Sequence, residues 1–514
     1  MTADRENPVI RAPYGAVRGR WERSVAVFRG IPYAAPPFGP RRFRPPVPPD
    51  RWDGVRDAAA FGPTAPKPPY SETFAQYLSD PAVPGDDCLN LNVWTPDPAP
   101  GARLPVLVWL HGGALTRGSS AVPVYDGHTF ARDGVVFVSL NYRLGVEGYG
   151  LFPDAPANPG LRDQLAALRW VHESIEAFGG DPDRITLGGQ SAGAISTGAL
   201  IAAPQARGLV RRAVLQSGPP EVTDRDKVRR VVRRMAHRLK VPATAEAFAA
   251  VDRGQLLRVQ ADIGRLSSPI LGGPAFGVVV DGDLVPRDPL EALTDGAARG
   301  VDLLTGWTRD EYRLWLVPGG LMERVDRLGA VALAGAMARC RCGSEVPRGY
   351  RALHPDAGTA ELVGQMVTDH LLRVPLHRLA DGRQDPSYVY EFAWPSRRPG
   401  MGACHALELG FVFDSGHEPD ARKLAGEGAP QDLADAMHGA WVRFITDGSP
   451  GWERWNEKHP VRVFGDGPPH TVPGPRDREL ALWTAPAEHP APAPTPELRS
   501  VVRRLRRTGA LRRT

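Results

Sequence analysis

Residues 184–194 read Arg-Ile-Thr-Leu-Gly-Gly-Gln-Ser-Ala-Gly-Ala, a β-branched apolar run that passes through glycines to a serine and then into small residues. Within it, residues 189–193 have the pattern G-x-S-x-G. A serine lifted above a sheet needs a sharp strand-to-helix turn and a strained backbone, and glycines two residues to either side avoid a collision there. The pattern predicts that Ser191 is a nucleophile. The N–H of Ala192 would face the reacting oxygen at a helix N-terminus, where negative charge is favoured.

Buried strands alternate with helices on both sides of this turn. A helix opening at 158–164 keeps one apolar face through residue 175, and Gly179-Gly180 ends it. The expected buried strands are continuous apolar runs at 104–110, 135–140, 213–217 and 301–306, with a further strand at 388–392. This alternation predicts a mostly parallel sheet with helices on both faces, as in the α/β-hydrolase fold.

Other segments give weaker signals. Residues 87–94 alternate apolar and polar, which predicts a half-buried strand, and 278–286 should return to strand and turn. We expect residues 1–484 to form one catalytic domain with helical lid insertions at roughly 222–262 and 319–380. Residues 485–514 are expected to be a Pro/Ala linker and an Arg-rich, disordered tail.

The charge of the chain is concentrated at one end. The whole chain carries a formal net charge of +5, and the residues from Glu488 onward hold seven arginines against two acids, so the rest is neutral. We therefore expect no nucleic-acid partner, although a tail that touches nucleic acid or an anionic membrane is the alternative. No apolar run approaches the length of a membrane span, and the N-terminus lacks a signal-like apolar region, so a cytoplasmic location is expected.

The cysteines suggest neither a disulfide framework nor a metal centre. Cys340 and Cys342 lack a second pair of ligands, and Cys404 adjoins His405, whose side chain would point the other way in extended chain. Cys88 stands alone. We expect no metal and no organic cofactor.

A serine nucleophile requires a base and an orienting acid, which follow it in the chain order Ser, acid, His in α/β-hydrolases. Glu311 lies just past the strand that ends at residue 306, and His405 lies in a loop of small residues after the strand at 388–392. They are the candidate acid and base, with Asp310 and Asp283 as alternatives for the acid. His111-Gly-Gly-Ala114 ends another buried strand, so its backbone N–H groups could supply the rest of an oxyanion hole.

The chain closely resembles the type-B carboxylesterase family, which includes bacterial p-nitrobenzyl esterases, animal carboxylesterases and cholinesterases. The resemblance runs from about residue 16 to 444 and implies that Ser191, Glu311 and His405 form a catalytic triad. It also implies that Gly113, Ala114 and Ala192 donate to the oxyanion and that Ser217 contacts the triad. The matching stretches lie at 28–34, 87–93, 111–114, 141–145, 160–164, 178–187 and 402–409.

The departures from the family are also informative. The family usually has glutamate before the nucleophilic serine, where this chain has Gln190, so we expect a weaker preference for cationic substrates. No cysteine precedes Cys88 and no tryptophan lies between Pro63 and Cys88, which is unlike the cholinesterases.

The sequence therefore predicts a serine esterase that acts on small-molecule esters. An acyltransferase that uses the same acyl-enzyme is one alternative, and a non-catalytic interaction protein is a more remote one. The sequence does not identify the ester or the oligomeric state.

Overall fold

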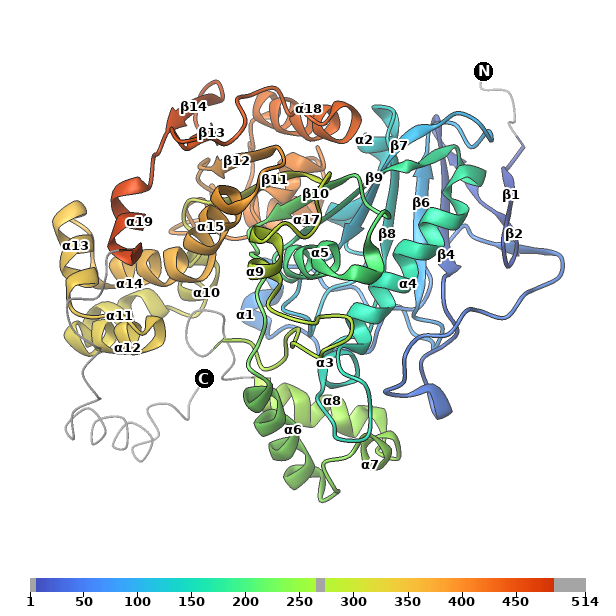
Figure 1. The fold of residues 1–514 in the computed structure, drawn as a ribbon, viewed down its shortest axis with the longest axis horizontal. Coiled ribbons are helices and arrows are strands. Elements are labelled where there is room, and N and C mark those ends of the chain that lie inside the picture. Colours follow the sequence, from blue (N-terminus) through green and yellow to red (C-terminus); the bar gives the residue numbers. More distant parts are fainter. Residues whose placement is uncertain (1–5, 265–272, 485–514) are drawn as a thin grey trace.

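The computed structural model describes residues 6–264 and 273–484, which are built around an 11-stranded sheet (Figure 1). Every neighbouring pair from β8 to β13 runs parallel, whereas the strands at both edges pair antiparallel. In spatial order the strands are β14 (His470–Pro473), β13 (Pro460–Phe464), β12 (Ser387–Phe392), β11 (Asp302–Thr308), β10 (Arg212–Gln216), β9 (Gly180–Gln190), β7 (Leu104–Leu110), β8 (Val136–Leu140), β6 (Asn90–Thr95), β4 (Val25–Pro32) and β3 (Arg20–Glu22). A separate sheet holds β1 (Val9–Ala12), β2 (Gly15–Arg18) and β5 (Val55–Asp57).

Apolar side chains fill both faces of the large sheet. Along β7, Val106 and Val108 point into one core, and Leu107 and Trp109 point into the other, as the period of two in a strand requires. The first core is closed by α4 (Pro159–Ser174), α5 (Ala192–Ala202), α9 (Pro289–Thr294) and α15 (Val374–Gly382). The second is closed by α2 (His128–Arg132), α16 (Leu409–Val412), α17 (Pro419–Ala425) and α18 (Gln431–Asp447). The predicted α/β-hydrolase fold is confirmed.

Helices away from the sheet occupy the first of the two segments predicted to be lids and most of the second, whose last residues, 374–380, belong to α15 on the sheet. The first forms the lower lobe of Figure 1, and the second gathers at the left of that view with small apolar cores of its own. The first contains α6 (Arg225–Leu239), α7 (Ala245–Ala249) and α8 (Arg253–Gly264); α10 (Arg313–Leu316) leads into the second, which contains α11 (Leu321–Leu328), α12 (Ala330–Cys340), α13 (Glu345–Leu353) and α14 (Thr359–Thr368). The remaining helices are α1 (Glu72–Ala75), α3 (Gly145–Tyr149) and α19 (Asp477–Thr484), with short 3-10 or π turns at Gly39–Arg41, Pro123–Tyr125, Ile175–Phe178, Pro204–Ala206 and Asp369–Arg373.

Two local predictions were wrong. Strand β6 is buried on both faces, because Leu91 and Val93 pack in the first core and Trp94 packs in the second. Its polar Asn90 and Asn92 are satisfied by hydrogen bonds, Asn90 to the Pro63 carbonyl and Asn92 to the hydroxyls of Ser120 and Ser139. Residues 278–280 form no strand, although Val278 and Val279 are buried. The Val279 N–H donates to the Asn158 side chain at 3.0 Å instead of joining a ladder.

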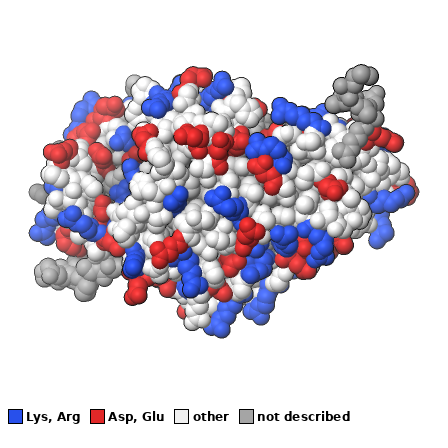
Figure 2. All heavy atoms as spheres, turned by 90° about the horizontal axis from the view of Figure 1, so that it is seen from above, with Lys and Arg blue, Asp and Glu red and all other residues white. Residues whose placement is uncertain are grey.

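Charged side chains of both signs lie side by side on the face seen in Figure 2 rather than in a patch of one sign. None of the helices formed by the described residues combines the length and the apolar character needed to span a bilayer. The predicted Arg-rich tail, 485–514, lies outside the described residues.

Candidate active site

Ser191 occupies the turn between β9 and α5, where its backbone has φ 56° and ψ −123°. A Cβ on Gly193 would lie 1.9 Å from the carbonyl oxygen of Leu110, and one on Gly189 would lie 2.5 Å from the carbonyl carbon of Gly193. Only glycine fits at either place, as the pattern predicted. The turn is fixed from the neighbouring strand by the Ser191 N–H, which donates to Gln216 O at 2.8 Å.

Glu311 and His405 meet beside this turn. Glu311 follows β11 and is fully buried, and His405, which is 5% exposed, lies in the loop after β12. His405 Nδ1 lies 2.5 Å from Glu311 Oε2, while Glu311 Oε1 accepts from the Thr308 N–H at 2.8 Å. Burial alone would raise the pKa of Glu311, but the charge and hydrogen bond of His405 outweigh it and lower that pKa. The carboxylate is therefore ionised and able to orient the imidazole.

The second ring nitrogen of His405 faces Gln190. The two Nε2 atoms lie 3.1 Å apart, so the Gln190 amide donates to the nitrogen that a serine nucleophile would need. Within the described residues the hydroxyl of Ser191, which is partly exposed, makes no hydrogen bond. For His405 to act on Ser191, its Nε2 must release the Gln190 amide and accept a hydrogen bond from the Ser191 hydroxyl instead.

The loop after β7 lies against the elbow. A Cβ on Gly112 would be 3.3 Å from Ser191 Cβ, and Gly113 and Ala114 have φ 116° and φ 53°. In the part of the chain that the structure describes, no hydrogen bond uses the N–H of Gly113 or Ala114. The first N–H groups of a helix, here from Ala192 onward, also lack intrahelical acceptors. These donors are available to an oxygen bound at Ser191.

The alternative acids have other partners. Asp283 is exposed and forms an ion pair with Arg162 at 2.8 Å, and both line a cleft that none of Ser191, Glu311 and His405 borders. Asp310 Oδ2 accepts from the Ala403 N–H at 3.0 Å and so helps to hold the histidine loop in place. Neither contacts His405. Ser217 is buried, and its hydroxyl lowers the pKa of Glu311 without reaching full hydrogen-bond geometry in this conformation.

Two neighbours of the site were missed from the sequence. Trp315 packs on His405 with ring centroids 4.7 Å apart. It follows Glu311 by four residues, a helical spacing that could have predicted its position near the acid. Glu408 follows His405 by three residues and is fully buried. Its Oε1 accepts from Gln216 Nε2 at 3.2 Å, and its Oε2 has no partner among the described residues. Burial, and then the adjacent Glu311, raise the pKa of Glu408 to about 7.

A mostly parallel sheet with helices on both faces, and a strained serine on a strand-to-helix turn, define an α/β-hydrolase. The sequence profile of the carboxylesterase family matches residues 6–461. The para-nitrobenzyl esterase of Bacillus subtilis is 35% identical over 459 residues, which cover 87% of this chain and 91% of that protein. The phenmedipham hydrolase of Pseudarthrobacter oxydans is 36% identical over 489 residues, which cover 89% and 95%.

Solved structures agree with these relatives. The carboxylesterase of Geobacillus stearothermophilus at pH 6.2 superposes with a TM-score of 0.82 and 36% identity, over 93% of this chain and 100% of that one. A thermophilic PNB esterase superposes with a TM-score of 0.81 and 31% identity, over 93% and 100%. The chain belongs to the carboxylesterase family and is a carboxylic ester hydrolase.

Proposed function

We propose that the chain hydrolyses carboxylic esters through an acyl-enzyme on Ser191, with His405 as the general base and Glu311 as the orienting acid. The observation that carries this proposal is the buried His405–Glu311 pair beside the strained serine. The ionised carboxylate holds Nδ1 protonated, which leaves Nε2 as the basic nitrogen.

In the proposed mechanism Ser191 Oγ attacks the ester carbonyl while His405 Nε2, released from Gln190, takes the hydroxyl proton. The N–H groups of Gly113, Ala114 and Ala192 stabilise the resulting oxyanion, each by about 3 kcal/mol in the transition state. His405 then gives its proton to the leaving alcohol, and later activates the water that cleaves the acyl-enzyme. No step requires a metal or a cofactor.

We propose uncharged esters with aromatic substituents as the substrate class. The side chain next to the nucleophile is the neutral Gln190, so it adds no charge that would attract a cationic alcohol group. The names of two relatives refer to a para-nitrobenzyl ester and to phenmedipham.

We propose further that residues 1–484 act as one catalytic domain in which the helices of 222–262 and 319–380 cover the bound ester. The contact of Trp315 with His405 supports this, because it brings the chain leading into the second segment onto the triad. The expected cytoplasmic location and the absence of a nucleic-acid partner stay predictions.

The test is hydrolysis of p-nitrophenyl esters from acetate to laurate by the wild type and by Ser191→Ala. We expect the variant to lose about 10⁵-fold or more in kcat, because the nucleophile is gone. Ser71→Ala is the matched control, since Ser71 is exposed and its side chain caps no helix.

A variant within tenfold of the wild type would reject Ser191 as the nucleophile. Added alcohols distinguish hydrolysis from acyl transfer: an ester product would show transfer, and acid alone would show hydrolysis.

A further inference from the structure

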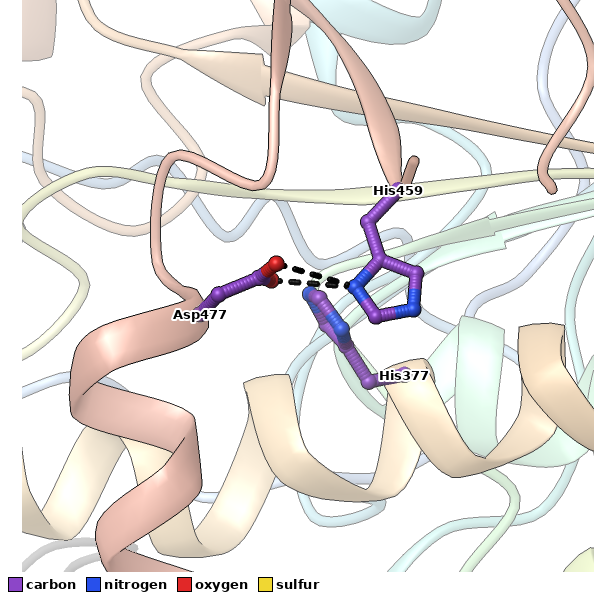
Figure 3. A group of neighbouring side chains, drawn as sticks. All are labelled: His377, His459 and Asp477. Carbon is purple, nitrogen blue, oxygen red and sulfur yellow. Dashed lines mark hydrogen bonds and ion pairs between the residues drawn. The ribbon is translucent and has the colours of Figure 1, made fainter. Parts of the chain in front are cut away.

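A second group of titratable side chains lies outside the active site. His377 on α15, His459 just before β13, and Asp477 at the start of α19 point toward one another (Figure 3). One potential ligand atom from each lies within 4.8 Å of the others, and His459 Nδ1 lies 3.1 Å from both oxygens of Asp477. We call these three residues the His377 cluster.

His377 supplies an observation that an ordinary packing role does not explain. The residue is 8% exposed, and its Nε2 is buried without a hydrogen-bond partner among the described residues. That atom points at the Asp477 carboxylate and the His459 ring in Figure 3. A buried polar atom without a partner is unfavourable unless a ligand reaches it.

His459 is held in the orientation that a metal ligand needs. Its ring stacks on Trp455 with centroids 4.8 Å apart and an interplanar angle of 8°. Its Nε2 lies 3.7 Å from Asp381 Oδ1, an oxygen that accepts from Trp455 Nε1 at 2.7 Å. Metal-binding histidines commonly present their other ring nitrogen to a carboxylate, which fixes the tautomer. In the metal-free chain Nδ1 donates to the nearer Asp477 carboxylate, so an ion that binds Nδ1 displaces this proton, and Asp381 lies on the Nε2 side to accept from the ring in its other tautomer.

We propose that the His377 cluster binds one zinc ion through His377 Nε2, His459 Nδ1 and an Asp477 oxygen. Two imidazoles and one carboxylate form a ligand set that zinc accepts, with water in the fourth position. Zinc bonds of about 2.0–2.2 Å require the more distant ligand atoms to approach one another by up to roughly 1.5 Å. Asp477 is exposed and His459 partly so, which permits this closure and gives the ion a path from solvent.

The ion would fasten α19 to the catalytic body. Arg476, which precedes Asp477, forms an ion pair with Glu391 at 3.2 Å. Glu391 also accepts a hydrogen bond from Trp307 on β11, and the His377 ring stacks on the ring of Trp307. Further along α19, Glu479 lies 3.1 Å from His354, which follows α13. Trp483 donates to the hydroxyl of Tyr350, which is on α13, at 2.9 Å. The role is structural, since no residue of the proposed triad contacts the cluster, and the ion connects the sheet through α19 to the second helical segment.

The test uses the full chain without a polyhistidine tag, freed of metal by a chelator and titrated with zinc in a calorimeter. We expect one equivalent to bind, and Co²⁺ to give a visible absorption band typical of a site with nitrogen ligands. His377→Gln and Asp477→Asn should each weaken zinc binding at least tenfold. Zinc should raise the Tm of the wild type by about 2 °C or more and leave that of His377→Gln unchanged.

His354→Gln is the matched control, because it removes another histidine–acid contact of α19 but no proposed ligand. It should bind zinc like the wild type. Turnover of a p-nitrophenyl ester shows that each variant is folded, and Asp477→Asn serves if the buried His377→Gln fails to fold. Zinc affinity that is absent from the wild type, or equal in the wild type and both ligand variants, would overturn the proposal.

Discussion

His405 and His377 are both buried, both face a carboxylate, and both pack on a tryptophan ring, but they differ in the hydrogen-bond partners of their ring nitrogens. His405 has a partner on each nitrogen, Glu311 on one side and Gln190 on the other. His377 leaves Nε2 without any partner in the described parts of the chain. The first arrangement orders a side chain for chemistry without a further ligand, whereas the second leaves one nitrogen available for the proposed ion.

The difference follows from where the partners come from in the fold. Ser191, Glu311 and His405 follow β9, β11 and β12, parallel strands whose carboxyl ends share one edge of the sheet. The His377 cluster is drawn from a helix, a loop and the N-terminus of another helix. Strand ends in a buried sheet fix positions closely, and the exposed start of α19 can adjust to an ion.

The largest expected difference between the two sites is in kcat, when the carboxylate of each site is replaced by an amide. Glu311→Gln should lower kcat about 10³–10⁴-fold, because the amide neither holds Nδ1 protonated nor stabilises the imidazolium. Asp477→Asn should change kcat less than twofold. The measurement is hydrolysis of one p-nitrophenyl ester by both variants, with circular dichroism to confirm folding. A loss under tenfold in Glu311→Gln would remove Glu311 from the mechanism, and a large loss in Asp477→Asn would mean that the two sites are coupled.

The sequence predicts much of the active site because its geometry is encoded locally. The elbow needs Gly189 and Gly193 on steric grounds alone, and strand order places Glu311 and His405 at the same sheet edge. On the residues alone, Asp310 and Asp283 competed with Glu311, and the structure separates them by the partners they have: Ala403 for Asp310 and Arg162 for Asp283.

Features that depend on tertiary contacts could not be predicted from the sequence. The burial of β6 on both faces follows from the two cores that its side chains enter, and the loss of a strand at 278–280 follows from the side chain of Asn158. The His377 cluster joins residues spread over 100 positions, from 377 to 477. No spacing rule connects such residues, since the contact exists only once α15, β13 and α19 have packed.

Gln190→Glu should give the next largest effect. The Gln190 amide donates to a neutral His405, but a carboxylate there would instead accept from the protonated ring and favour it. We expect the acid limb of the kcat/KM profile to move up by roughly one pH unit, so that turnover falls about tenfold below that limb and changes little above it. A cationic ester should become relatively better than a neutral one. An acid limb at the wild-type position would show that Gln190 does not set the protonation of the base.

Glu408→Gln should give the smallest effect, and on stability rather than turnover. Glu408 resembles His377 in having an unpartnered buried atom, Oε2, but protonation removes the charge that is costly to bury, and the pKa of Glu408 is raised from 4.5 to about 7. A raised carboxyl pKa means that the folded state loses stability as the pH rises from about 4.5 through 7. Above pH 7 the cost is complete and on the order of 3 kcal/mol. A neutral amide avoids it and can still accept from Gln216.

Glu408→Gln should therefore raise Tm by about 2–3 °C at pH 8 and leave it unchanged near pH 5. Thermal melts at the two pH values measure this, with the exposed Glu457→Gln as the control that should change neither. An equal gain at both pH values would mean that packing rather than charge is responsible, and a loss at pH 8 would mean that the ionised carboxylate is stabilised by His405. Either outcome would separate Glu408 from His377, because the behaviour of Glu408 would then not be that of a buried group with an unpartnered atom.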